Sequence, residues 1–250
     1  MGNKLRMRGM VICALAVGMI AAFSPPARAA EPVPLRLLVV TGGHDYPTSF
    51  YTLFDEPAQF HWDHTTSNHE AFQSDLRDKY DVLVLYDMST EISEAEKKNV
   101  VDFLESGKGM VVLHHAILDY PQWEWWWRDL VGGKYLTNPE GGMPASTYLH
   151  DQEIDVEPAL KHPILAGIGP MHLLDETYKG MWISPQVTAL LKTRNPTSDP
   201  VVAWISPYQK SRVVYIQLGH GEPAHRNPGY RKLVHNAILW SAGKLNPKTK

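Results

Sequence analysis

Histidine follows three separate apolar runs of this 250-residue chain. Histidine titrates near neutral pH and, when neutral, ligates metal ions, so it suits acid–base or metal chemistry. The histidines concerned are His44, the pair His114 and His115, and His220. The apolar runs before them cover residues 35–40, 110–113 and 212–218. Ligands of open α/β sheets bind beyond the carboxyl ends of the strands, so these distant histidines are predicted to share one pocket.

The two adjacent histidines, His114 and His115, are predicted to have different roles. Neighbouring residues on a strand point to opposite faces of the sheet. His115 lies further into the loop, so we assign it the reactive role and count His114 among the substrate-binding residues.

Two acidic residues, Asp175 and Glu176, are candidates for the acid–base group of the pocket. One interpretation is a turn or helix start with solvated acids. The other is a carboxylate placed over the histidines, as a general base or to orient a ring. Three further residues are predicted to contact substrate, because they lie beside these candidates or at a strand end: Asp45, Tyr178 and Gly219. Glycine lets a backbone approach a ligand closely.

A cluster of tryptophans at residues 123–127 follows the histidine pair. At helical spacing Trp123 and Trp126 share one face, and such a face usually packs in a core. The alternative is that these indoles wall the pocket, because flat rings with a polar N–H suit the C–H faces and hydroxyls of sugars.

Several familiar catalytic classes are excluded by the sequence. It has no nucleophile elbow, no Walker A loop and no H-E-x-x-H zinc motif. The cofactor is therefore unknown, and a divalent metal ion held by the histidines stays open.

The first thirty residues are typical of an export signal. Lys4, Arg6 and Arg8 precede the apolar residues 10–23, and Ala27-Arg28-Ala29 is an A-x-A cleavage site. We expect a periplasmic or secreted mature protein consisting of one domain, residues 31–250, with no membrane association after cleavage. The net charge of −3 and the lack of a basic stripe argue against nucleic acid as a partner, and homo-oligomerisation stays open.

The remaining pattern predicts an α/β fold. Strands are expected at residues 35–40, 60–66, 81–86 and 110–114, alternating with helices at 48–57, 70–77 and behind the capping box Ser93–Glu96. This alternation indicates a doubly wound, mostly parallel sheet with helices on both faces. Less regular strands follow at residues 148–156, 187–192, 201–205 and 212–218, with helices at 122–131 and 230–242.

An ordered set of short phrases resembles the trehalose-utilisation, ThuA-like family. The matching phrases lie at residues 39–44, 109–115, 126–133, 162–164, 175–178, 200–204, 212–215, 218–220 and 237–240. The resemblance implies a flavodoxin-like fold similar to the class I glutamine amidotransferases. It also implies a role in the catabolism of trehalose or other sugars. Those amidotransferases carry a cysteine nucleophile where this chain has His114-His115, so their chemistry is not expected here.

These observations lead to one hypothesis with two alternatives. The hypothesis is an exported enzyme that acts on a sugar, glycoside or keto-sugar by acid–base chemistry in the histidine pocket. The alternatives are a carbohydrate-binding protein without catalysis and a metal-dependent hydrolase using the same histidines.

Overall fold

The structure, a computed structural model, describes residues 1–2, 33–55 and 59–245. The chain divides into two compact units, Met1–Pro32 and Val33–Lys250, and the fold and the site described below belong to the second. The predicted export signal and its predicted cleavage site fall almost wholly outside the described residues. Among the described residues, no helix combines the length and the apolar character needed to cross a membrane.

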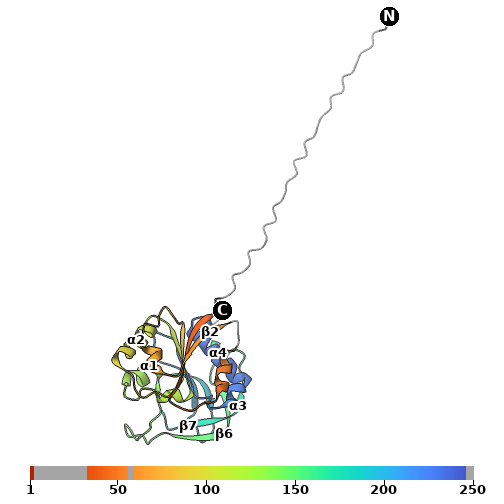
Figure 1. The fold of residues 1–250 in the computed structure, drawn as a ribbon. Helices are drawn as coiled ribbons and strands as arrows, with labels where there is room; N and C mark the ends of the chain where they lie inside the picture. Colours follow the sequence, from red (N-terminus) through yellow and green to blue (C-terminus); the bar gives the residue numbers. More distant parts are fainter. Residues whose placement is uncertain (3–32, 56–58, 246–250) are drawn as a thin grey trace. The chain divides into compact units, whose positions relative to one another are not determined.

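A nine-stranded sheet forms the centre of this unit, with the strand order β2-β1-β3-β4-β11-β10-β9-β6-β7 (Figure 1). The first five strands in this order are parallel to one another. They are β2 (Phe60–Thr65), β1 (Leu35–Gly42), β3 (Val82–Asp87), β4 (Gly109–Leu113) and β11 (Val213–Ile216). The inner strands β3, β4 and β11 are buried at every position, as their continuous apolar sequences require.

The other strands are antiparallel, so the expectation of a mostly parallel sheet is wrong for this half. They are β10 (Val201–Ile205), β9 (Thr188–Thr193), β6 (Thr147–Pro158) and β7 (Met171–Lys179). Strand β7 contains Asp175 and Glu176, for which one of the two sequence interpretations is a turn or a helix start. The acidic residues made the partly alternating pattern of this strand difficult to recognise in the sequence. The strand is stabilised by pairing with β6 along most of its length. Two short strands, β5 (Gly133–Lys134) and β8 (Trp182–Ile183), form a separate small sheet.

Helices lie between and beside the strands. The α-helices are α1 (Asn68–Phe72), α2 (Glu94–Glu105), α3 (Glu222–Arg226) and α4 (Pro228–Ser241). Shorter helical turns are η1 (Thr48–Phe54), η2 (His114–Leu118), the π-helical η3 (Trp126–Val131) and η4 (Pro163–Leu165). The capping box at the start of α2 is present, with Ser93 and Glu96 each accepting from the other's backbone N–H. The helices expected at residues 48–57 and 70–77 are both shorter than predicted.

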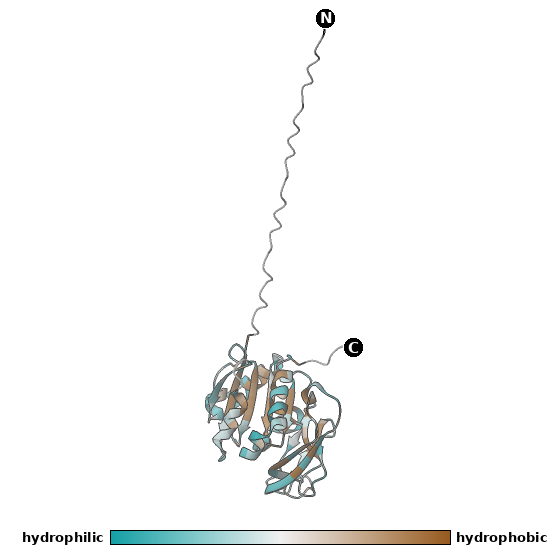
Figure 2. Cartoon of the chain, turned by 90° about the vertical axis from the view of Figure 1, so that its right-hand side faces the viewer, coloured by the Kyte–Doolittle hydropathy of each residue, from teal (hydrophilic) through white to brown (hydrophobic). Residues whose placement is uncertain are grey.

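Two hydrophobic clusters cover the two faces of the sheet. Alternate residues of β1 enter different clusters: Leu37 and Val39 pack with η1 and α4, whereas Leu38 and Val40 pack with α1, α2 and η3. Helical segments therefore cover both faces. The strands between them stand out as hydrophobic in Figure 2.

The antiparallel half curls back toward the parallel half. In the sheet order, three strands separate β7 from β11, yet the Asp175 carboxylate of β7 accepts hydrogen bonds from the backbone just after β11. This curl brings β7 to the carboxyl ends of the parallel strands, where the histidines lie.

Candidate functional site

Histidines from three strand ends lie together at the carboxyl edge of the parallel strands. The rings of His44 and His115 stack with centroids 4.8 Å apart. The centroid of His114 is 5.3 Å from that of His115 and 5.2 Å from that of His220. The placement follows from the parallel topology, because β1, β4 and β11 all end at this edge.

Neither histidine of the pair belongs to a strand, so the strand geometry expected for them is absent, although His115 and not His114 lines the cavity described below. They open the turn η2, and His114 has a φ of 51°, in the left-handed region. That conformation costs a residue other than glycine roughly 1–3 kcal/mol and is concentrated at functional sites. The turn places both rings against the same cluster instead of on opposite faces.

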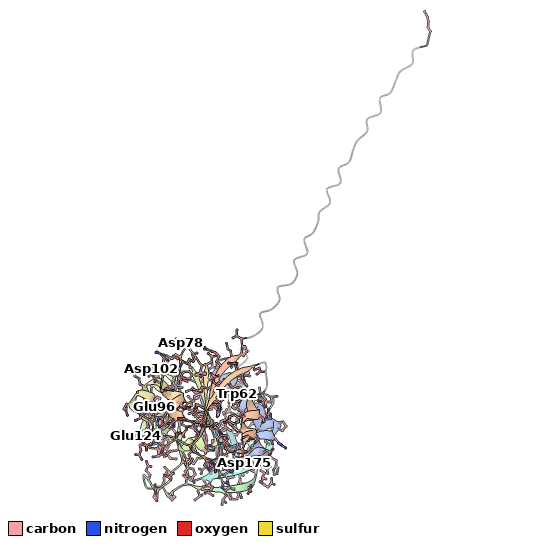
Figure 3. All side chains as sticks on the ribbon, in the orientation of Figure 1. Trp62, Asp78, Glu96, Asp102, Glu124 and Asp175 are labelled. Carbon is pink, nitrogen blue, oxygen red and sulfur yellow. The ribbon has the colours of Figure 1, made fainter. Side chains whose placement is uncertain are left out.

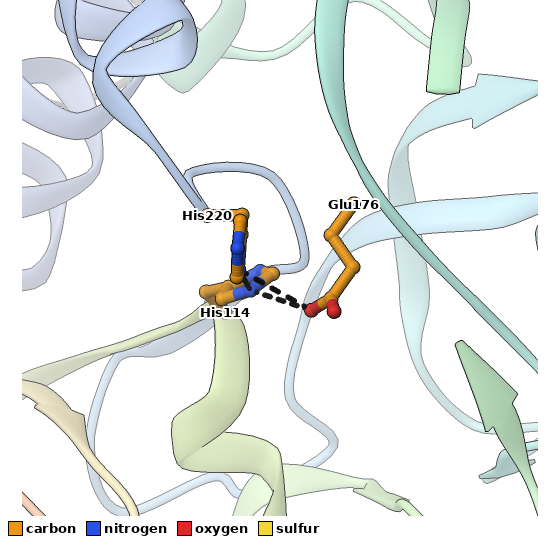
Figure 4. Close-up of side chains that lie close together, drawn as sticks. All are labelled: His114, Glu176 and His220. Atoms are coloured by element: carbon orange, nitrogen blue, oxygen red, sulfur yellow. Dashed lines mark hydrogen bonds and ion pairs between the residues drawn. The ribbon is translucent and has the colours of Figure 1, made fainter. Parts of the chain in front are cut away.

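His114 is the most connected side chain of the cluster and is fully buried. Its Nδ1 donates to the backbone carbonyl of Gln217 at 2.6 Å. Its Nε2 lies 3.0 Å from Glu176 Oε2, 3.0 Å from the Tyr178 hydroxyl and 3.1 Å from His220 Nδ1. Figure 4 shows His114, Glu176 and His220 converging from three segments of the chain.

Glu176 is a charged group on the wall of a cavity. The residue is only 5% exposed, and its Oε1 lies 3.0 Å from His150 Nδ1. Burial opposes its ionisation, but the hydrogen bond and charge of His114 and the charge of His220 outweigh burial and lower the pKa of Glu176. The site therefore favours a carboxylate at this position.

Asp175 does not line the cavity, and the structure gives its carboxylate a supporting place instead of the acid–base position expected. Successive residues of β7 point to opposite sides, and Asp175 accepts backbone N–H bonds from Glu176, Gly219 and His220 at 2.8–2.9 Å. Burial raises the pKa of Asp175, while the charge of His114 and these three bonds oppose that rise. It lies on the side of the molecule that carries β6 and β7 (Figure 3). Asp175 holds the His220 loop in place.

Gly219 belongs to the same support and is not available to a ligand. Its N–H donates to Asp175, and its carbonyl accepts from the Tyr86 hydroxyl at 2.7 Å and from His225 Nε2 at 2.9 Å. Its φ is +117°, and a Cβ there would lie 2.1 Å from the Tyr230 hydroxyl. The close approach that requires glycine is therefore to Tyr230, and Gly219 is not part of the cavity lining.

The cavity beside Glu176 has a volume of about 360 Å³, within the usual range of small-molecule sites. Its lining consists of His44, Met88, His115, Leu118, Tyr135, Thr137, Ser146, Tyr148, His150, Glu176 and Tyr178. His220 is not part of this lining, and its side chain is 31% exposed. Three tyrosines supply aromatic surface and hydroxyl groups.

Trp123 and Trp126 do not line this cavity and pack in a hydrophobic cluster instead. Trp126 is buried in the cluster that packs on α2 and η3, with its ring against Tyr120 and Trp123. Trp123 is partly buried on the outer side of that cluster, with Lys97 over its ring. The apolar side of η3 faces the sheet because burying large indoles there removes the most apolar surface from water.

His115 and Asp45 also differ from expectation. His115 lines the cavity but is 3% exposed, and its Nε2 donates to the carbonyl of Tyr86 at 3.1 Å. Burial and the charges of His114 and His44 lower the pKa of His115 far below its usual range, so His115 is neutral. Asp45 has an exposed side chain outside the lining, although its carbonyl accepts from His44 Nδ1 at 2.5 Å.

His150 is a site residue that no sequence pattern indicated. It lies in β6 where the register with β7 shifts by one residue, between the pairs Leu149–Thr177 and Gln152–Asp175. A β-bulge of this kind changes the direction of a side chain. It brings His150 to Glu176 and to the ring of His220, 4.8 Å away between centroids.

A second, larger cavity of about 480 Å³ lies at the outer edge of the antiparallel half. Its lining includes Asp155, His172 and Arg194 and none of the cluster described above. His172 there is an exposed side chain between two acids, Glu153 at 2.6 Å and Asp155 at 2.8 Å.

Fold and site together define an α/β protein with a carboxylate–histidine cluster beside a cavity at the carboxyl edge of its parallel strands. The model of the ThuA family, described as trehalose utilisation, matches residues 36–241. The chain belongs to this family. No curated protein matches it in sequence.

Solved structures share the fold. A ThuA-like protein from Parabacteroides merdae is 16% identical with a TM-score of 0.73, covering 87% of this chain and 93% of that one. A ThuA-like protein from Bacteroides uniformis is 20% identical with a TM-score of 0.67, covering 89% and 97%. A β-galactosidase from Rahnella sp. R3 is 13% identical with a TM-score of 0.58. That match covers 86% of this chain but only 32% of the enzyme.

Proposed function

We propose that this protein is an enzyme of carbohydrate catabolism that transforms a sugar, glycoside or keto-sugar in the cavity beside Glu176. The family supports the substrate class, since its description is trehalose utilisation. The observation that carries the proposal is the Glu176 carboxylate itself. It is nearly buried, contacts three histidines, and lies on the wall of a cavity of about 360 Å³.

The chemistry proposed is proton transfer. A carboxylate paired with imidazoles can take a proton from a sugar carbon or hydroxyl and return it elsewhere, which is general acid–base catalysis. His150 binds the oxygen of Glu176 that the deeper histidines leave free. The tyrosines of the lining offer hydroxyls to the sugar and flat surfaces to its C–H groups.

We further propose that the parallel half is flavodoxin-like and that the protein is exported. The order β2-β1-β3-β4-β11 supports the first point, because it is the flavodoxin-like order 2-1-3-4-5 when β11 is counted as the fifth strand. The basic and apolar residues before the A-x-A site support the second, together with periplasmic or secreted localisation.

The test is turnover of a panel of glycosides, free sugars and keto-glycosides by the wild-type chain and by Glu176→Gln. We expect the variant to lose about 10²-fold or more in kcat, because the amide keeps the shape but cannot accept the proton. Glu153→Gln is the matched control. It also removes a glutamate bound to a histidine, but on the exposed outer edge, and should leave kcat unchanged.

Equal rates for Glu176→Gln and the wild type would contradict the acid–base role. Saturable sugar binding without turnover of any panel member would instead establish the carbohydrate-binding alternative.

A further inference from the structure

Three electron-rich atoms meet at one point of the candidate site. His114 Nε2 is 3.0 Å from Glu176 Oε2 and 3.1 Å from His220 Nδ1, and the latter two atoms are 3.5 Å apart. Among the described residues, these three form the one group of histidine, cysteine and acidic side chains with the proximity needed to hold a metal ion.

The hydrogen bond on the far side of His114 determines what its Nε2 can do. The Gln217 carbonyl can only accept, so His114 Nδ1 must carry a proton. In the neutral ring Nε2 then has a lone pair and no proton. That lone pair can accept from the Tyr178 hydroxyl at 3.0 Å or bind a cation, and the Glu176 oxygen, also 3.0 Å away, favours a cation or an added proton between the two atoms.

We propose that His114 Nε2, Glu176 Oε2 and His220 Nδ1 bind a divalent transition-metal ion, with zinc as the best match. This inference deepens the proposed function and rests on the same cluster.

The spacing of the three atoms fits such an ion. Zinc binds histidine nitrogen and carboxylate oxygen at about 2.0–2.2 Å, so ligand atoms at tetrahedral or octahedral angles lie roughly 2.9–3.5 Å from one another. The three measured separations fall in this range. Two imidazoles and one carboxylate suit zinc and its first-row neighbours, whereas calcium and magnesium prefer oxygen ligands alone.

The surroundings supply the supporting contacts of a metal site. A ligating histidine almost always donates its other N–H to a carbonyl or carboxylate, as His114 does to Gln217. The second oxygen of Glu176 is held by His150. Asp175 fixes the backbone of His220 through the N–H of that residue and of Gly219.

The cavity beside the three atoms indicates which class of substrate the metal ion would bind. Glu176 and Tyr178 belong to the cavity wall, so the proposed metal site adjoins the cavity. Two neighbouring sugar oxygens, such as a carbonyl and the adjoining hydroxyl of a keto-sugar, would fit there as chelating ligands. The oxygen of Glu176 shared with His150 would remain for proton transfer.

The test is metal binding by the full-length protein after treatment with a chelator. Calorimetric titration with Zn²⁺, and absorption spectra with Co²⁺, should show one ion per chain with nitrogen ligation. His220→Ala and Glu176→Gln should each weaken binding by about 10-fold or more. His172→Ala is the matched control, since it removes an exposed histidine that also contacts two acids, and should bind as the wild type does.

His220 is partly exposed, so its variant should fold, and circular dichroism would verify this. Failure of the folded wild type to bind Zn²⁺ or Co²⁺ would overturn the inference and leave an added proton between His114 and Glu176. Equal loss of binding in His172→Ala would also overturn it. Sugar turnover that is unaffected by chelator, with no metal bound, would contradict the metal site but not the proposed function. Metal binding without turnover of any sugar would contradict the proposed function but not the metal site.

Discussion

At the scale of residues, the site is accompanied by a second unusual group, the buried acids Asp87 and Asp119. The neighbours of these acids in the chain, Met88 and Leu118, line the cavity. Ser89 binds both acids, its hydroxyl to Asp87 and its N–H to Asp119, each at 2.7 Å. Burial raises the pKa of Asp87 to about 6 and raises the pKa of Asp119 well above its usual value. Burial therefore favours the protonated form of both acids.

The raised pKa of Asp87 predicts a pH-dependent stability. Its pKa is higher in the folded chain than the unfolded value of 3.8, so the folded state binds more protons between these values. The stabilisation is present below pH 4 and is lost as the pH rises through about 6. Replacing Asp87 by Asn should reduce the fall in unfolding free energy between pH 4 and pH 7 by about 2 kcal/mol.

Urea denaturation of the wild type and Asp87→Asn at both pH values measures this difference. Asp63→Asn is the control, because Asp63 is exposed and binds the Tyr80 hydroxyl at the surface. An unchanged pH dependence in Asp87→Asn would show that another group carries the effect.

At the scale of elements, the loop from β11 to α3 decides where His220 lies. Asp175 binds two of its N–H groups, and Tyr86 and His225 bind the Gly219 carbonyl. His225 is itself held by the Ser49 hydroxyl at 2.9 Å. Segments from both halves of the sheet thus fix one loop, which leaves little freedom for His220.

Replacing Gly219 by Ala should therefore destabilise the protein and displace His220. The new Cβ would meet the Tyr230 hydroxyl at 2.1 Å, in addition to the cost of a positive φ for a residue with a side chain. We expect a loss of more than about 2 kcal/mol in urea denaturation, together with weaker substrate or metal binding.

Gly107→Ala separates the cost of a positive φ from the cost of the contact with Tyr230. Gly107 has a similar positive φ of +85°, but nothing lies within 4 Å of the position of its Cβ. Gly107→Ala should therefore lose only the stability that a positive φ costs, and the geometry of the site should not change. Equal effects of the two substitutions would mean that the Tyr230 contact has no role in positioning the loop.

At the scale of the whole molecule, one hydrophobic cluster joins the two halves of the sheet. It includes Val39 of β1 and Val84 of β3 in the parallel half, Ile154 of β6 and Leu173 of β7 in the antiparallel half, and Ile238 of α4. Because the site takes residues from both halves, its geometry depends on this shared core.

Replacing Ile154 by Ala should destabilise the whole domain. The side chain is fully buried, and such truncations cost about 2–5 kcal/mol. Circular dichroism and tryptophan fluorescence should report one coincident urea transition with a lower midpoint. Leu174→Ala, at a 38% exposed position of β7, is the control and should change stability little. Two separate transitions would instead show that the antiparallel half unfolds independently.

The sequence alone predicted the parts of the fold that depend on local patterns. Continuous apolar runs placed β1, β3, β4 and β11 to within a few residues, and the capping box placed the start of α2. The ordered phrases led to the ThuA family, which the match over residues 36–241 confirms. Local spacing could also indicate that His44, His114, His115 and His220 follow strands, because strand ends are visible in the pattern.

Only the tertiary structure decided which of these groups face one another. The acids of β7 reach the histidines because the antiparallel half curls back, and pairing in a sheet leaves no local signal in either strand. The same pairing turns Glu176 toward the cavity and Asp175 toward the loop. A bulge in β6 brings in His150, and the left-handed turn at His114 places the histidine pair in η2 instead of in a strand. Contacts between distant segments set these directions, whereas sequence periodicity records only which residues are buried.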